Sequence, residues 1–277
     1  MEIEEFKIVS TDSTELVGMH WFNESNPKAA ICIAHGFAEH QQRYTHVAQF
    51  FTDKGFSVFT YDQRGHGKSP GKRGHFRSFS VLLDDLENFV KHTRRTFNDI
   101  PIILYGHSFG GAVVTNYIFK KNINEIKGAL ITSPWLRLAF EPPRVKVRLA
   151  KLVNSILPSH TEPNDLDPDL LSNDKEVCRR YAADPLVHKK ISVRAFLEIT
   201  RTGEHIIRQA DKAKIPMLLA HGSHDKITAR EATIELAGKL GDQCTLKIWE
   251  GLQHETHNEI NFEEVLTFNL SWINNLL

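Results

Sequence analysis

The residue best placed to do chemistry is Ser108, at the centre of the pentapeptide G-H-S-F-G at 106–110. The apolar run 102–105 before it predicts a buried strand, and apolar side chains within 112–118 recur at the spacing of one helix face. A serine in such a strand-to-helix turn has strained backbone and an exposed hydroxyl, and free N–H groups at the helix N-terminus favour negative charge. We therefore predict that Ser108 is a nucleophile. The alternative is a surface serine in a glycine-rich turn.

A serine hydroxyl is a weak nucleophile at neutral pH, so Ser108 needs a base, and that base needs an acid to orient it. Asp225 follows a predicted strand at 215–220, and His254 follows the next predicted strand at 244–249. The order serine, aspartate, histidine is that of α/β-hydrolases, which predicts a catalytic triad of Ser108, Asp225 and His254. A helix-capping or loop acid and a surface histidine are the alternatives, and His257 is the rival for the base.

Two backbone N–H groups are predicted to bind the oxyanion that forms when Ser108 attacks a carbonyl. One belongs to Phe109, the residue after the nucleophile, and the other to Phe37, in the loop after the apolar run 29–34. His35 and His107 lie beside these donors and are predicted to be structural. The polar, glycine-rich segment 62–69 is predicted to brace the site through hydrogen bonds.

Fifteen histidines raise the alternative of a metal site. The segment 254–257, H-E-T-H, lacks the H-E-x-x-H spacing that places two imidazoles on one helix face, and the cysteines lack zinc spacing. We therefore predict chemistry without a metal or another cofactor.

Bulk composition narrows the class of protein. The 277 residues are 41% hydrophobic, and 34 basic residues balance 34 acidic ones, so nothing indicates nucleic-acid binding. The widely spaced Cys32, Cys178 and Cys244 argue against a disulfide framework and for a reducing compartment. The N-terminus has no signal-peptide pattern, and no apolar run approaches the roughly 18 residues that cross a bilayer. We expect a soluble, cytoplasmic protein.

Strand-like and helix-like segments alternate along most of the chain. Two alternating segments joined by a turn predict an antiparallel start, and the later continuous apolar runs are typical of parallel strands covered on both faces. We expect strands at 2–9, 16–22, 29–34, 56–61, 102–105, 127–132, 215–220 and 244–249, and helices at 44–54, 80–96, 144–157, 193–210, 230–240 and 262–277. The pattern predicts the α/β class, with a doubly wound, mostly parallel central sheet, antiparallel N-terminal strands and helices on both faces. Together with the order serine, aspartate, histidine, it predicts an α/β-hydrolase fold.

The alternation stops at 134–190, where seven prolines cut the chain into short pieces. We predict an inserted helical cap there, between two parts of the hydrolase core at 1–133 and 191–277, with no good strand and one clear helix at 144–157. Two interpretations of that helix stay open: a lid that packs its apolar face over the active site, and a helix that dips into a membrane or micelle surface. Its apolar face has Val145, Leu149, Leu152, Val153 and Ile156, and its opposite face has Arg144, Arg148 and Lys151.

Six motifs follow one another along the chain: H-G-F-A-E-H at 35–40 with R-Y at 43–44, D-Q-R-G-H-G-K-S at 62–69, G-H-S-F-G-G at 106–111, Y-A-A-D-P-L at 181–186, H-G-S-H-D at 221–225 and G-L-Q-H-E-T-H-N-E at 251–259. With these motifs the chain resembles the monoacylglycerol lipase and lysophospholipase group of α/β-hydrolases, which shares features with serine aminopeptidases. The resemblance implies that His254, and not His257, is the base, and that Tyr181 binds substrate near the leaving glycerol. Phe109 replaces the usual methionine, which alters a pocket wall but not the backbone N–H.

The resemblance also implies the reaction: a serine hydrolase that cleaves the ester of a single-chain acyl lipid, with monoacylglycerol as the first choice, through an acyl-enzyme. The alternatives are a lysophospholipase or general carboxylesterase, then an aminopeptidase and, outside enzymes, a hydrolase-fold binding module. The expected partner is the acyl-lipid substrate, without nucleic acid and with transient peripheral membrane contact through the cap. The oligomeric state is left open.

Overall fold

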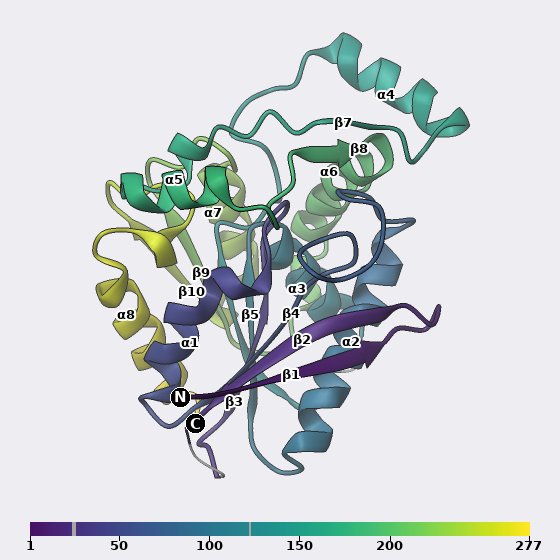
Figure 1. Cartoon of the computed structure of the whole chain (residues 1–277). Helices are drawn as coiled ribbons and strands as arrows, with labels where there is room; N and C mark the ends of the chain where they lie inside the picture. Colours follow the sequence, from purple (N-terminus) through teal and green to yellow (C-terminus); the bar gives the residue numbers. More distant parts are fainter. Residues whose placement is uncertain (24–25, 122) are drawn as a thin grey trace.

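A mixed sheet with helices on both faces forms the centre of the computed structural model, which describes residues 1–23, 26–121 and 123–277 (Figure 1). Its eight strands run in the order β1-β2-β4-β3-β5-β6-β9-β10. They are β1 (Glu2–Val9), β2 (Glu15–Phe22), β3 (Ala30–Ala34), β4 (Ser57–Tyr61), β5 (Ile102–His107), β6 (Ile126–Thr132), β9 (Met217–Gly222) and β10 (Cys244–Trp249). β1 pairs with β2 and β2 with β4 in antiparallel fashion, and the remaining pairs are parallel. The predicted α/β-hydrolase fold with antiparallel N-terminal strands is confirmed.

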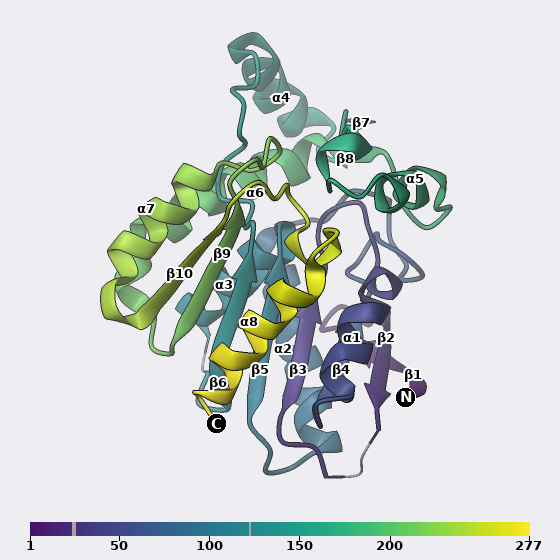
Figure 2. The same ribbon diagram turned by 90° about the vertical axis from the view of Figure 1, so that its left-hand side faces the viewer.

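Two separate sets of helices bury the two faces of the sheet (Figure 2). One face packs against α1 (Thr45–Thr52) and α8 (Phe262–Asn274), and the other against α2 (Phe79–Thr96), α3 (Phe109–Lys120), α6 (Val193–Arg208) and α7 (Arg230–Leu240). Within β3, Ile31 and Ile33 belong to the first core, whereas Cys32 belongs to the second. Because successive side chains of a strand point to opposite faces, burial on both sides explains the unbroken apolar runs of the sequence.

The segment 134–190 lies at one end of the sheet, where Figure 1 places α4 farthest from the strands. It contains α4 (Arg144–Ile156) and α5 (Lys175–Ala183), and β7 (Thr161–Pro163) pairs with β8 (Lys190–Ser192). The expectation of no strand and a single clear helix in this segment was therefore wrong. The two strands have only three residues each, and tertiary pairing creates them. Helix α5 has nine residues and is marked by its cap, since the Asp174 side chain accepts a hydrogen bond from the N–H of Glu176.

The predicted elements of the core are confirmed with small shifts at their ends. The helix expected at 44–54 is α1 preceded by a 3₁₀ turn, Gln41–Tyr44, and α6 and α8 end two and three residues earlier than expected. Within the described ranges, no helix combines the length and apolar character needed to cross a membrane.

Candidate active site

Ser108 occupies a tight turn between β5 and α3, as predicted. Its φ of 52° and ψ of −115° are unusual for a residue other than glycine. A Cβ atom at Gly110 would lie 2.0 Å from the carbonyl oxygen of Ala34, and one at Gly106 would lie 2.7 Å from the carbonyl oxygen of Gly110. Both glycines are therefore needed for the close approach of strand and helix. The turn places Ser108 directly before the first residue of α3, at the positive end of the helix dipole.

Asp225 and His254 lie in neighbouring loops because β9 and β10, which they follow, are adjacent parallel strands. His254 Nδ1 is 2.7 Å from Asp225 Oδ2, and the two side chains are 4% and 0% exposed. An imidazole that donates its Nδ1–H to a carboxylate presents Nε2 as an acceptor on the opposite side of the ring. His254 and Ser108 line the same cavity.

Each partner of this pair offsets the cost of burying the other's charge. Burial alone would raise the pKa of Asp225, but His254 and the hydrogen bonds to the carboxylate hold that pKa well below its ordinary value. Burial alone would lower the pKa of His254, but Asp225 outweighs it and raises the pKa of the imidazole. The arrangement stabilises an imidazolium, the form that a base takes after it accepts a proton.

His257, the rival for the base, lies in a different environment. Its ring stacks on that of Tyr44 with centroids 4.9 Å apart, and neither ring nitrogen has a hydrogen-bond partner among the described residues. Burial lowers the pKa of His257 well below its ordinary value. Asp225 thus contacts His254, the histidine chosen from the motif.

The two predicted oxyanion donors belong to segments on either side of Ser108. Phe109 is the first residue of α3, where an N–H has no acceptor within its own helix. Phe37 follows Gly36, whose N–H donates to Glu39 Oε1 over 2.5 Å. The rings of Phe37 and Phe109 pack edge to face, 5.5 Å apart. Glu39 therefore fixes the backbone immediately before Phe37.

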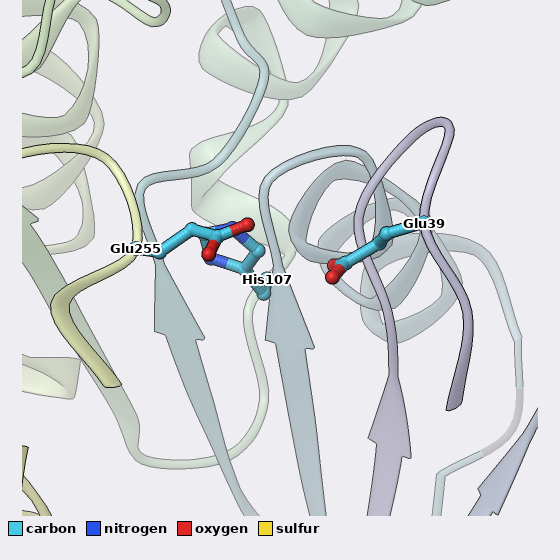
Figure 3. A group of neighbouring side chains, drawn as sticks. All are labelled: Glu39, His107 and Glu255. Atoms are coloured by element: carbon cyan, nitrogen blue, oxygen red, sulfur yellow. The ribbon is translucent and has the colours of Figure 1, made fainter. Parts of the chain in front are cut away.

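A buried charge cluster lies next to this loop, formed by Glu39, His107 and Glu255, whose side chains converge (Figure 3). One ligand atom from each lies within 4.8 Å of the others, close enough to hold a metal ion. The guanidinium of Arg43 already provides the positive charge: it donates to both oxygens of Glu255 over 2.6 and 2.7 Å and also to Glu39. Burial alone would raise the pKa of Glu255, but Arg43 outweighs it and lowers the pKa to about 2.

Glu39, Arg43 and Glu255 are part of the quoted motifs, but of the residues in and around this cluster only His107 had a predicted role, a structural one. Arg43 joins the loop that carries Phe37 to the residue after His254, so a single side chain connects two parts of the predicted machinery. Charged residues are almost never fully buried unless they are paired. Two acidic residues and an arginine within motifs that surround the predicted site are therefore the signal that could have indicated a buried ion pair.

The segment 62–69 is hydrogen-bonded in the way predicted, with one exception. Asp62 accepts from the N–H groups of Gln41 and Lys68 over 2.8 and 2.7 Å, and Ser69 Oγ donates to the carbonyl of Asp62 over 2.5 Å. Arg64 instead pairs with Asp85 on α2 at 2.6 Å. The Asp62 side chain braces the loop around the site, whereas Arg64 ties the segment to the helical layer.

A cavity of about 460 Å³ opens above Ser108 between the sheet and the segment 134–190. Ser108 and His254 lie at its base together with polar side chains of Glu39, Tyr181 and Glu255, and Tyr181 also packs its ring 4.7 Å from the Arg43 guanidinium carbon. The other walls are largely apolar and include Trp135, Leu138, Phe140, Val147, Val153 and Phe196.

Helix α4 roofs the cavity with only part of its apolar surface. Val147, Ala150 and Val153 are half-buried and line the cavity, whereas Val145, Leu152 and Ile156 are 75%, 61% and 73% exposed. Most of the predicted apolar stripe is thus exposed while one side of the helix lines the cavity, so both interpretations of this helix stay open. The periodicity of a sequence shows which residues share an apolar stripe of a helix, but not whether that stripe faces the protein or the solvent.

Comparison with known proteins places this geometry in a family. Residues 25–261 match the Hydrolase_4 family, described as serine aminopeptidase, S33. An uncharacterized abhydrolase domain-containing protein of Dictyostelium discoideum is 37% identical over 268 residues, which cover 96% of this chain but only 28% of that protein. Monoacylglycerol lipase of Mycolicibacterium smegmatis is 32% identical over 255 residues, 91% of this chain and 90% of that one. The crystal structure of Paleococcus ferrophilus monoacylglycerol lipase superimposes with a TM-score of 0.84 at 29% identity and covers 100% of both chains.

Proposed function

The chain belongs to the Hydrolase_4 (serine aminopeptidase, S33) family of α/β-hydrolases, and on this basis we propose that it hydrolyses the ester of a monoacylglycerol to glycerol and fatty acid. The observation that carries the proposal is the hydrogen-bonded Asp225–His254 pair, whose His254 lines a largely apolar cavity together with Ser108. The monoacylglycerol lipases of M. smegmatis and P. ferrophilus, similar over nearly their whole lengths, support the choice of substrate.

In the proposed mechanism, His254 Nε2 accepts the proton of Ser108 while Ser108 Oγ attacks the ester carbonyl. The N–H groups of Phe37 and Phe109 bind the resulting oxyanion, and Asp225 stabilises the imidazolium. His254 then returns the proton to the departing glycerol oxygen, leaving an acyl-enzyme. Water attacks this ester with His254 again as base, and the fatty acid leaves.

Polar side chains beside Ser108 suit the hydroxyl groups of a glycerol head group. Glu39, Tyr181 and Glu255 supply polar groups near Ser108, where the hydroxyls of glycerol can form hydrogen bonds, and we place Tyr181 against the leaving alcohol. Arg43 is the buried cation beside them, and two carboxylates already bind it. Lys146 and Lys226, which also line the cavity, could meet the phosphate of a lysophospholipid, so the choice of monoacylglycerol over that alternative rests on the two named relatives.

We propose further that α4 collects the substrate at a lipid bilayer. Its exposed Val145, Leu152 and Ile156 form one stripe of the helix, and Arg144 and Arg148, also exposed, belong to its basic face. A helix with one apolar and one basic face suits the interface of an anionic membrane. The half-buried side of the same helix lines the cavity that contains Ser108, which gives lipid a route from the bilayer to the site.

The domain division and the compartment belong to the same proposal. Residues 134–190 would act as a cap inserted between the core segments 1–133 and 191–277. The chain would work in the cytoplasm, because its three cysteines, two of them buried, are unpaired and suit a reducing compartment. Its peripheral contact with the membrane would be made by α4.

Fluorophosphonate labelling with peptide mapping, beside a substrate panel, tests the proposal. The panel contains a monoacylglycerol, lysophosphatidylcholine, p-nitrophenyl butyrate and an aminoacyl amide, compared by kcat/KM. We expect the label on Ser108 and the highest kcat/KM for monoacylglycerol. A label on Ser108 without monoacylglycerol cleavage would keep the serine hydrolase and remove the lipase, and the absence of a label would remove both.

A further inference from the structure

The carboxylate of Asp225 accepts more hydrogen bonds than the pair with His254 requires. Oδ1 accepts from the backbone N–H groups of Ile227 and Thr228 over 2.7 and 3.0 Å. Oδ2 is 2.7 Å from His254 Nδ1, 2.8 Å from Thr228 Oγ1 and 2.9 Å from Nε2 of a second histidine, His221. Two imidazoles therefore meet at one carboxylate oxygen.

The surroundings of His221 determine which of its nitrogens carries the proton. His221 belongs to β9, and its side chain is 0% exposed. Nε2 faces two acceptors, Asp225 Oδ2 and the carbonyl of Thr228 at 3.2 Å, so Nε2 must be the donor. Nδ1 lies 2.8 Å from the hydroxyl of Thr233 on α7, which can donate to it. This arrangement satisfies both ring nitrogens of a neutral imidazole.

We propose that His221, fixed by Thr233, is a positioning residue for the triad: it holds Asp225 Oδ2 in place for His254 and draws part of the carboxylate charge toward itself. The inference rests on the triad of the proposed function. A neutral donor suits this task because a second cation beside Asp225 would oppose the charge that forms on His254 during the reaction. Thr233 keeps His221 in the tautomer that donates to Asp225.

This role predicts a direction for the pH dependence of catalysis. Without His221, the negative charge of Asp225 is less shared and attracts the proton of His254 more strongly, so His254 stays protonated to higher pH. The other charged or titratable groups near His254 are Glu255, Glu39, Arg43, His107 and His257. None of them contacts His221 through a described hydrogen bond. Glu231 of α7 is also near His221, and its carboxylate accepts a hydrogen bond from Arg230.

The test is a pair of substitutions at His221, assayed with p-nitrophenyl butyrate so that the result does not depend on the lipid preference. In His221→Leu, which removes the donor, we expect kcat/KM at neutral pH to fall about tenfold and the acid limb of the pH profile to move up by about half a pH unit. His221→Gln retains an amide that can donate to Asp225 and accept from Thr233. It should recover most of the activity and return the acid limb to the wild-type position.

Proton NMR of the His254 Nδ1–H supplies a readout that needs no substrate. Its resonance should move in His221→Leu and return in His221→Gln, and Thr233→Val should give a smaller change in the same direction even if His221→Leu fails to fold. An acid limb and a resonance that stay in place in the folded variants would overturn the proposal, whatever the loss of activity. Fluorophosphonate labelling of Ser108 in wild-type protein separates this outcome from failure of the proposed function.

Discussion

The side chains of Asp225 and His254 are 0% and 4% exposed. Helix α4, which covers the cavity that His254 lines, has no buried residue. The loops after β9 and β10 are fixed by hydrogen bonds from several elements, including the Ser133 Oγ bond to the His254 carbonyl and the ion pair of Arg43 with Glu255. Helix α4 instead meets the rest of the chain through a few half-buried side chains, three of them apolar, and Asn154 accepts a hydrogen bond from Arg194 over 2.8 Å.

The difference fits the division of work that we propose within one cavity. Acid–base chemistry needs fixed distances and defined protonation states, which a buried and densely hydrogen-bonded environment provides. Collecting an apolar substrate needs exposed apolar surface and freedom to move, and a helix with few packing contacts provides both. Changes in the core loops should therefore affect turnover and stability, and changes on α4 should affect access to lipid.

The largest effect is expected at the nucleophile. Ser108→Ala removes the attacking oxygen, so kcat for monoacylglycerol should fall by about 10⁴-fold or more. Fatty-acid release measures the loss, and thermal unfolding should be nearly unchanged. The matched control is Ser80→Ala, at an exposed serine, which should keep wild-type turnover. A Ser108→Ala variant with wild-type turnover would contradict the triad.

The next effect is on stability, at the buried ion pair. Arg43→Met leaves Glu39 and Glu255 buried without their cation, so the free energy of unfolding should fall by about 3–5 kcal/mol. Lys7→Met breaks the exposed pair with Glu15 and should leave the free energy of unfolding nearly unchanged. Urea unfolding measures both. Equal losses in the two variants would show that burial does not distinguish the pairs.

Acid should weaken the core through its buried neutral histidines. Burial lowers the pKa of His35 and His107 to about 3 and that of His20 to about 4, from 6.5. Between the lowered pKa values and 6.5, the unfolded chain binds more protons than the folded chain. The contribution of the neutral histidines to the free energy of unfolding is therefore fully present above pH 6.5 and falls as the pH drops toward about 4. Urea unfolding across this range measures the slope. His20→Gln should reduce the slope by about one proton, and an unchanged slope would argue against a neutral buried His20.

The smallest effect is expected on α4. Ile156→Ser should weaken binding to phosphatidylcholine vesicles with added phosphatidylglycerol by about tenfold, while hydrolysis of p-nitrophenyl butyrate stays unchanged. Ile260→Ser is the matched control, because Ile260 is 75% exposed and Ile156 is 73% exposed. Vesicle sedimentation measures the binding. If both variants bind like wild type, or weaken equally, α4 is not the contact surface.

Much of the fold can be predicted from local patterns of residue types in the sequence. The continuous apolar run at β3 reflects burial on both faces of a parallel sheet, and the alternation of strands and helices predicts the layers. The G-x-S-x-G turn requires its glycines because of contacts within 3 Å, so the motif alone predicts the strained backbone of Ser108. The short β7 and β8 escaped prediction because three residues carry no periodicity.

By itself, the sequence determined the types and order of the chemically active residues: a serine in a strand-to-helix turn, an acid and a histidine after the last two parallel strands, and a proline-rich insertion. Only the tertiary structure decided which polar residues meet. Arg43 binds Glu39 and also Glu255, which lies more than 200 residues away along the chain. His221 on a strand likewise meets Thr233 on a helix. The exposed direction of the α4 stripe was decided in the same way. The physical reason is that periodicity and turn chemistry act between neighbours in the chain, whereas hydrogen bonds and ion pairs depend on distances in space.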